Sequence, residues 1–373
     1  MFMTRPNHTR RKILGATGAT VLASVFGDTL FGLARRAEAK QVRTLRWGVV
    51  GTGGIANSMA GMIKLAEASE LAAVSSRRLE TAQAFGAKHD VPNTFDDWQK
   101  MIESKAVDAI YVATPTSVRE EICVAAAKSG KHVLGEKPFA SAASVKRITD
   151  ACKANNVAFM DGTHFVHHPR TLDIKKNHED RLGFVWSVAS AFQFNLTDRG
   201  NIRFNPSLEP MGAIGDAGWY NMRAAVEYLP SNAVLESVSA NLRRDKQTGA
   251  AISGTGVLNF SDGSTSTWNC GFDSGAVVMD LRITGTKGVI SIDDFLSQNP
   301  DGSADFLYRK GGWGNSESQD LNIPSSKPGP ALMFEDMAAA ASDPSLRAQW
   351  MSGTQRTQAL LDAVWEAALK SEG

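Results

Sequence analysis

The chain has 373 residues, of which 43% are hydrophobic and 21% are charged, a composition typical of a globular protein long enough for two domains. Residues 1–39 contain six Lys or Arg against two Asp or Glu, and the remainder has 34 basic against 37 acidic side chains. This slightly acidic balance argues against a nucleic-acid partner, which requires a clustered basic face. Three cysteines without paired spacing predict small buried side chains, and neither a disulfide framework nor a zinc site.

The first 39 residues resemble a twin-arginine export signal. Arg10 and Arg11 precede a moderately apolar run over residues 13–34, which ends near the small residues Ala37 and Ala39 of an A-x-A cleavage site. We therefore expect export to the periplasm by the twin-arginine translocation machinery and a mature chain without a stable membrane span. The alternative is a retained membrane anchor, since about 20 residues can cross a bilayer.

A glycine-rich turn follows the first predicted strand, residues 45–50. Gly51 permits a tight turn, Gly53 removes the Cβ that would block a pyrophosphate, and Ala56 takes the third small position of G-x-G-x-x-G/A. The free N–H groups of the helix that begins there would face the anion. The turn therefore predicts a dinucleotide site.

Strands and helices alternate through the rest of this half. The expected strands cover residues 70–76, 91–95, 109–113, 132–135 and 157–160, with helices after the glycine turn, from 79 to 85, from 118 to 129 and from 142 to 154. Such alternation predicts a parallel sheet covered on both faces. Ligands of these sheets bind beyond the carboxyl ends of the strands.

The second half is predicted to be mainly β-structure. The expected strands cover residues 184–194, 235–242, 251–260, 264–271, 277–285 and 288–292, with a hairpin turn at 261–263. This pattern predicts an open, mostly antiparallel sheet. Residues 297–327 read as a loop region, and residues 345–370 as a closing helix whose apolar stripe packs against the core.

Three motifs together resemble the Gfo/Idh/MocA oxidoreductase family over residues 44–373. They are the glycine turn, A-T-P at 113–115 and G-K-H-V-L-G-E-K-P at 130–138. Residues 161–163, 168–170 and 215–220 are similar to the branch that contains glucose-fructose oxidoreductase and dimeric dihydrodiol dehydrogenase. The resemblance implies a signal peptide (1–39), an NAD(P)-binding Rossmann domain with a doubly wound parallel sheet (40–160), and a C-terminal substrate and oligomerisation domain (161–373).

The resemblance also implies the cofactor contacts. They are Gly51, Thr52, Gly53, Gly54, Ile55, Ser76, Arg77, Arg78, Thr114, Pro115, Glu136 and Lys137. An NAD enzyme usually has Asp or Glu at the end of the second strand, where this chain has two serines followed by two arginines. Arginine can hold a 2′-phosphate, so we expect NADP(H) rather than NAD(H). The alternative is two solvated arginines at the start of a helix.

Lys137, Asp216 and Tyr220 are the expected catalytic residues. In the family the lysine of E-K-P lies beside the nicotinamide and polarises the substrate oxygen. Asp216 and Tyr220 stand four residues apart and share a face if one helix carries both. We expect Tyr220 to transfer the proton and Asp216 to orient the substrate; the alternative for Tyr220 is a buried structural tyrosine.

Arg119, His164 and His167 are weaker candidates for substrate contacts. Arg119 stands where many relatives have a histidine, so their substrate contacts do not transfer directly. The two histidines could line the substrate cleft or be satisfied structural residues. No acidic or cysteine partner stands at ligand spacing, so we expect no metal site.

Two function classes remain open. The first is an exported NADP-dependent oxidoreductase that acts on a sugar, a polyol or a related hydroxy-carbonyl compound, as a homodimer or homotetramer. The second is a dinucleotide-binding sensor or scaffold of the same fold without turnover. Lys137 together with Tyr220 favours the enzyme.

Overall fold

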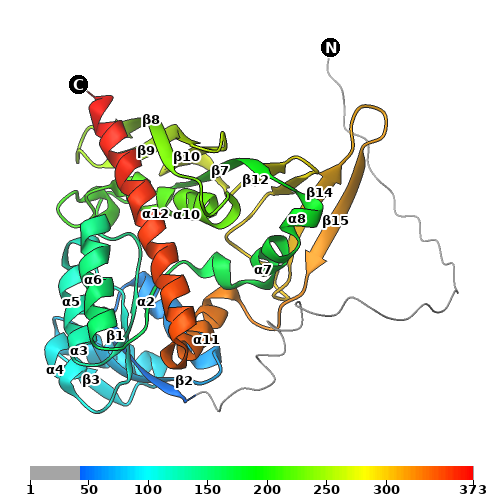
Figure 1. Cartoon of the computed structure of the whole chain (residues 1–373). Helices are drawn as coiled ribbons and strands as arrows, with labels where there is room; N and C mark the ends of the chain where they lie inside the picture. The colour runs from blue at the N-terminus through cyan, green and yellow to red at the C-terminus, as the bar shows by residue number, and fades with distance from the viewer. Residues whose placement is uncertain (1–42, 373) are drawn as a thin grey trace, which may run out of the picture. The chain divides into compact units, whose positions relative to one another are not determined.

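The computed structural model describes residues 43–372 (Figure 1). The predicted signal and its cleavage site lie outside these residues and stay predictions. Residues 43–372 belong to one compact unit, and the domain boundary expected after residue 160 stays a prediction.

The amino-terminal sheet has six parallel strands in the order β3-β2-β1-β4-β5-β6. The strands are β1 Leu45–Val50, β2 Ser69–Ser75, β3 Asn93–Phe95, β4 Ala109–Val112, β5 His132–Gly135 and β6 Phe159–Asp161. The order reverses between β1 and β4, which is where ligands of doubly wound sheets bind. The predicted Rossmann architecture is confirmed.

Helices cover both faces of this sheet. They are α2 Gly54–Leu65, α3 Leu79–His89, α4 Trp98–Glu103, α5 Thr116–Lys128 and α6 Ala142–Ala154. Because side chains alternate along a strand, Trp47 and Val49 pack with α2 and α3, whereas Val50 packs with α4, α5 and α6. Helix α11 (Gly329–Ser342) returns from the far end of the chain to the first of these faces, where Phe334 meets the Trp47 ring edge-on at 5.0 Å.

The second sheet has nine strands and is mostly antiparallel, as expected. The strands are β7 Val185–Asn195, β8 Leu235–Arg244, β9 Ala251–Phe260, β10 Thr265–Gly271, β11 Asp273–Val278, β12 Leu281–Gly285, β13 Val289–Ile292, β14 Ala304–Lys310 and β15 Glu317–Ile323. Only the central pair β7 and β10 is parallel. The turn between β9 and β10 contains Gly263 at φ +80°, which confirms the predicted hairpin.

Two expectations for this half were wrong. Residues 297–327 were expected to be a loop, yet they contain the paired strands β14 and β15. The single strand expected over 277–285 is divided between β11 and β12, which both pair with β7. Strand β15 is a polar segment that hydrogen bonds to β14 stabilise, although its local pattern does not favour a strand.

Short helices and one long helix join the two sheets. They are η1 His164–His167, α7 Pro169–Lys176, α8 His178–Arg181, η2 Ile202–Phe204, α9 Gly212–Asp216, α10 Gly218–Tyr228 and α12 Pro344–Lys370. Helix α12 crosses from α6 and β6 of the first sheet to α10 and β8 of the second (Figure 1). All three cysteines are free and buried, as predicted.

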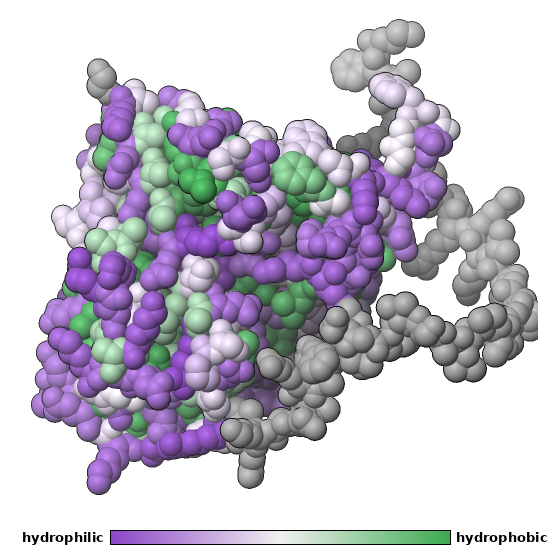
Figure 2. Space-filling model, in the orientation of Figure 1, coloured by the Kyte–Doolittle hydropathy of each residue, from purple (hydrophilic) through white to green (hydrophobic). Residues whose placement is uncertain are grey.

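Hydrophobic and hydrophilic residues alternate on the visible face of the molecule (Figure 2). On the face seen in Figure 2, hydrophobic residues form separate patches among hydrophilic ones. Within residues 43–372, no helix has both the length and the apolar character needed to cross a membrane.

Candidate active site

The glycine turn connects β1 to α2 and has room for an anion. Gly51 adopts φ +104°, and a Cβ there would lie 2.8 Å from the carbonyl oxygen of Ala113, so the fold itself requires glycine. A Cβ on Gly53 or Gly54 would meet no protein atom. Gly53 also caps α2 without a side-chain hydrogen bond, which leaves the first N–H groups of the helix available. These features fit a dinucleotide pyrophosphate.

The end of β2 carries no carboxylate. Ser76 follows the strand and shares a hydrogen bond of 2.6 Å with the hydroxyl of Thr81. Arg77 and Arg78 are exposed, and neither forms an ion pair with another residue in the described part of the chain. Two free guanidinium groups at this strand end fit a 2′-phosphate.

The segment after β4 lies on the same edge of the sheet. The hydroxyl of Thr114 is buried without a hydrogen-bond partner in the described residues, and Pro115 caps α5. Arg119 is only 4% exposed and donates to the carbonyl oxygens of Thr114 and Pro138. The structure thus places Arg119 as a link between the segments that follow β4 and β5, with its guanidinium turned to main-chain atoms.

Glu136 follows β5, but its side chain points into the protein. Its carboxylate accepts a hydrogen bond of 2.5 Å from the hydroxyl of Tyr111, on the neighbouring strand. A Cβ on Gly162 would lie 2.8 Å from the same carboxylate, so this glycine leaves the space that Glu136 fills. Burial raises the pKa of Glu136. Any cofactor contact through this side chain would require a different rotamer.

Lys137 binds Asp216, which brings two of the expected catalytic residues together. The Lys137 ammonium donates to the Asp216 carboxylate at 2.6 Å and to its main-chain carbonyl at 2.9 Å. A third residue, Arg203, binds the same carboxylate through Nε at 2.6 Å and Nη2 at 3.2 Å. Burial alone would raise the pKa of Asp216, but the charges of Lys137 and Arg203 hold it well below its usual range. Asp216 is therefore an ionised bridge between two cations.

Tyr220 lies beside this bridge. Its ring centre is 4.7 Å from the Lys137 nitrogen, and the rings of His164 and Phe192 pack against it at 5.8 and 5.6 Å. Its hydroxyl forms no hydrogen bond with another described residue, and it is not fully enclosed. Burial, followed by the charges of Glu136 and Asp216, raises the pKa of Tyr220 well above 10. The phenol is therefore protonated at neutral pH.

One expectation about this pair was wrong in detail. Asp216 and Tyr220 were expected on one helix, but α9 ends at Asp216 and α10 begins at Gly218. Ala217 between them keeps helical dihedral angles, and Tyr220 N–H bonds its carbonyl at 3.2 Å, which is a tighter turn than an α-helix. The two side chains still meet Lys137 from the same side.

The two candidate histidines lie in different surroundings. His164 contacts the Tyr220 ring, and burial, with the Lys137 charge second, lowers its pKa to about 4. His167 is buried against Trp350 and bonds Asp336 of α11 at 2.7 Å through Nδ1. The structure brings only His164 next to the catalytic candidates. No group of three or more metal-ligating side chains is clustered anywhere in residues 43–372.

A buried ion network fixes α10 against β6. Arg223, one turn after Tyr220, bonds Asp161 at 2.8 Å and Glu227 at 2.7 Å. Thr354 of α12 donates to the same Asp161 carboxylate at 2.5 Å. This network connects the helix that carries Tyr220 to the sheet that presents Lys137.

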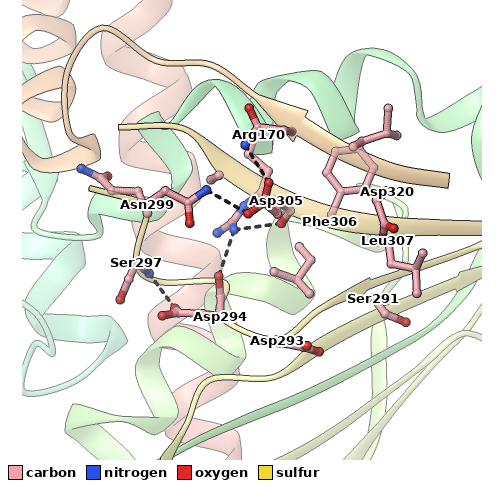
Figure 3. Close-up of a pocket in the computed structure, with 15 residues that line it drawn as sticks. Arg170, Ser291, Asp293, Asp294, Ser297, Asn299, Asp305, Phe306, Leu307 and Asp320 are labelled. Atoms are coloured by element: carbon pink, nitrogen blue, oxygen red, sulfur yellow. Dashed lines mark hydrogen bonds between the residues drawn. The ribbon is translucent and has the colours of Figure 1, made fainter. Parts of the chain in front are cut away.

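A cavity of about 560 Å³ lies apart from these residues, where β13 and β14 diverge (Figure 3). Its lining contains none of the three expected catalytic residues. The guanidinium of Arg170 bonds the main-chain carbonyls of Asp294, Phe295 and Asp305 at 2.8 to 3.2 Å. These bonds join the diverging strands and give Arg170 a structural role, and the candidate catalytic residue Lys137 lies outside this cavity.

Sequence reasoning missed Arg203 and Arg223. Arg203 lies in the segment between β7 and α9, where no motif marks it. Arg223 could have been noticed as a charged residue in an otherwise apolar stretch of helix, with Glu227 four residues later.

Comparisons with known proteins agree with this arrangement. Residues 45–163 match the model of the oxidoreductase family with an NAD-binding Rossmann fold (GFO_IDH_MocA), and residues 176–291 match the GFO/IDH/MocA C-terminal domain. D-xylose 1-dehydrogenase (NADP(+)) 2 of Haloferax volcanii is 29% identical over 272 residues, which cover 72% of this chain and 82% of that protein. Trans-1,2-dihydrobenzene-1,2-diol dehydrogenase of Bos taurus is 26% identical over 254 residues, covering 67% and 74% respectively.

A solved structure supports the fold. The 3-ketoreductase KijD10 from Actinomadura kijaniata, in complex with NADP and TDP-benzene, superposes with a TM-score of 0.77 over 87% of this chain and 98% of that one, at 23% identity. The two family models together match more than half of the 373 residues, and the protein is therefore a member of the Gfo/Idh/MocA family of NAD(P)-dependent oxidoreductases.

Proposed function

We propose that this protein is an exported NADP(H)-dependent oxidoreductase that moves a hydride between the nicotinamide and a carbinol or carbonyl carbon of a carbohydrate-like substrate. The observation that carries the proposal is the cluster of Lys137, Asp216 and Tyr220 at the carboxyl edge of the dinucleotide-type sheet. The names of the relatives support the substrate class, since one acts on D-xylose and another on a cyclic diol.

The residues divide the chemistry between them. A bound nicotinamide supplies or accepts the hydride. Lys137, held by Asp216, polarises the substrate oxygen with its ammonium. Tyr220 offers a hydroxyl that bonds no other residue within 43–372 and moves the proton on that oxygen. Because its phenol is protonated at neutral pH, Tyr220 is suited to donate a proton to a carbonyl oxygen during reduction.

The cofactor preference rests on the end of β2. Arg77 and Arg78 are exposed and free of ion pairs with described residues, and no carboxylate stands at Ser75 or Ser76 to repel a 2′-phosphate. The name of D-xylose 1-dehydrogenase (NADP(+)) 2 supports the same preference, as does that of scyllo-inositol 2-dehydrogenase (NADP(+)) IolU of Bacillus subtilis, 29% identical over 308 residues. We assign Arg77 the direct contact, with Arg78 beside it.

The alternative function is a dinucleotide-binding sensor without turnover. An experiment that separates the two loads the purified protein with NADP⁺ or NADPH and offers a panel of aldoses, polyols and ketoses. The enzyme predicts a change of absorbance in the reduced-nicotinamide band with at least one member of the panel. Tight dinucleotide binding without an absorbance change across the panel supports the sensor.

Export rests on Arg10 and Arg11 before the weakly apolar run and on the small residues before Lys40. Replacing both arginines with lysine should retain the precursor in the cytoplasm. A periplasmic signal of the double variant equal to that of the unchanged protein, or a mature terminus far from Lys40, would contradict this assignment.

A homodimer or homotetramer is proposed from the second sheet. Helices α9, α10 and α12 pack on one face, whereas small polar side chains such as Ser239 and Thr267 are exposed on the other. Light scattering of the purified protein tests the assembly; a monomeric mass at micromolar concentration would contradict it.

A further inference from the structure

We infer that Arg203 is a substrate-binding residue that recognises an anionic group, a carboxylate or a phosphate, close to the reacting carbon of a carbohydrate. The inference rests on the proposed function for the identity of the reacting carbon. The evidence for it is the arrangement of the hydrogen bonds between Arg203 and Asp216.

Arg203 uses only one edge of its guanidinium inside the protein. Nε and Nη2 bind the Asp216 carboxylate at 2.6 and 3.2 Å, while Nη1 has no hydrogen-bond partner among residues 43–372. A guanidinium has five N–H donors in a fixed plane. The Nη1 hydrogens and the second Nη2 hydrogen therefore form an unused fork, which matches the two oxygens of a carboxylate or phosphate.

The side chain that carries this fork is partly exposed to solvent. The Arg203 side chain is 37% exposed, whereas the side chains of Lys137 and Asp216 are 8% and 14% exposed. Of the two cations that bind Asp216, Arg203 is therefore the more exposed and Lys137 the more enclosed. Because Lys137 and Arg203 bind the same carboxylate, one small molecule could place an oxygen at Lys137 and an anionic group at Arg203.

The charges around Asp216 favour such an anion. The Asp216 carboxylate carries one negative charge and binds two cations, Lys137 and Arg203. It therefore balances only one of their two positive charges. Glu209, the next acidic residue in the electrostatic surroundings of Arg203, is held by Thr116 through its N–H at 3.0 Å and its hydroxyl at 2.6 Å. Neither carboxylate bonds Nη1 of Arg203, so an anionic group arriving there would meet a nitrogen without a carboxylate partner among residues 43–372.

The segment that carries Arg203 is fixed at both ends, which orients the fork in advance. Arg199 binds Asp245 of the β8–β9 turn at 2.9 Å, and Glu209 binds the start of α5. Asn201 caps the short helix η2 by accepting from the Arg203 N–H at 3.1 Å. Preorganisation of this kind lowers the entropic cost of binding a ligand.

Isothermal calorimetry on the NADP⁺-loaded protein tests the inference with two matched pairs of probes. D-gluconate differs from D-glucitol, and D-glucose 6-phosphate from D-glucose, by the charged group. We expect at least one charged probe to bind about 10- to 100-fold more tightly than its uncharged partner, the ratio typical of a charge-assisted hydrogen-bonded contact. The pair that shows the preference identifies carboxylate or phosphate.

Variants assign the preference to Arg203. Arg203→Met should abolish it and Arg203→Lys should reduce it, whereas Arg309→Met, an exposed arginine on β14 away from Asp216, should preserve it. Equal binding of charged and uncharged probes, failure of both charged probes to bind, or a preference that survives Arg203→Met would overturn the inference. If charged probes bind through Arg203 but no sugar changes the nicotinamide absorbance, the proposed function fails and the anion site stands.

Discussion

The ammonium of Lys137 lies 4.7 Å from the centre of the Tyr220 ring, and the same nitrogen binds the Asp216 carboxylate at 2.6 Å. The group proposed to polarise the substrate oxygen and the group proposed to move its proton are therefore one packed unit. Its parts come from both halves of the chain. A substitution that disturbs either half should therefore change the rate of hydride transfer.

Gly51 and Gly53 should respond differently to alanine. Gly51→Ala forces a side chain into φ +104° and against Ala113, so we expect a loss of stability of about 1–3 kcal/mol or more. Gly53→Ala meets no protein atom, so the melting temperature should stay nearly unchanged while NADP affinity falls about 10-fold or more. Calorimetric melting and nucleotide titration of both variants check this. Unchanged nucleotide affinity of Gly53→Ala would contradict the placement of the pyrophosphate.

Arg77→Ala should weaken NADP binding and leave NAD binding almost unchanged. Loss of a charge-assisted contact to the 2′-phosphate typically costs about 1.5–3 kcal/mol, roughly a 10- to 100-fold change in dissociation constant. Fluorescence titration with both nucleotides measures the effect. The matched control is Arg309→Ala, an exposed arginine on β14. Equal dissociation constants for NADP and NAD in the unchanged protein would remove the basis for this assignment.

The sequence allowed the first half of the fold to be predicted closely, because its signals are local. Helix α6 and strand β5 have the expected bounds, and Gly130 ends α5 with φ +72° as a C-terminal glycine. Strand β15 was missed because it is a polar edge strand, exposed along most of its length, whose backbone is stabilised by β14. Hydrogen bonds between distant segments leave no local pattern in the sequence.

The candidate site was predictable only where motifs mark it. Lys137 and Tyr220 were expected together and lie together, although their roles stay predictions. Arg203 was not expected, because its position depends on how the segment between β7 and α9 folds back onto Asp216. For His167 a substrate contact and a structural role were both left open, and its ring bonds Asp336 and packs against Trp350.

Breaking the buried network at Arg223 should cost far more stability than breaking an exposed pair. Arg223→Met would leave the Asp161 carboxylate buried without a cation and Glu227 with Lys175 alone, and such a loss typically costs about 3–5 kcal/mol. Arg244→Met, which breaks the partly exposed pair with Glu372, is the control and should cost under about 1 kcal/mol. Urea denaturation measures both. Similar losses in the two variants would show that the network does not hold α10 on β6.

Stability should fall as the pH drops from about 6.5 towards 4. Burial, with the Arg347 charge second, lowers the pKa of His132 to about 4, whereas an unfolded histidine titrates near 6.5. In this window the unfolded chain binds a proton that the folded chain excludes, so unfolding becomes easier by up to roughly 3 kcal/mol per group. His132→Asn keeps an acceptor for the Ala158 N–H and should flatten the pH dependence.

Chemical denaturation at several pH values tests that expectation. The control is His178→Asn. Because His178 is exposed, this variant should leave the dependence of the free energy of unfolding on pH unchanged. The same slope for His132→Asn and the unchanged protein would show that His132 does not contribute to acid sensitivity.

Single-turnover hydride transfer tests the central assignment most directly. With a substrate identified from the sugar panel, stopped-flow absorbance of the pre-loaded cofactor should show that Lys137→Ala slows transfer by a factor on the order of 10² to 10³. Tyr220→Phe, which keeps the ring beneath Lys137, should slow it by about 10² or more while NADP affinity and the melting temperature change little. Transfer at the unchanged rate in both variants would contradict the account; a normal rate in Tyr220→Phe alone would direct the search for the proton donor to His164.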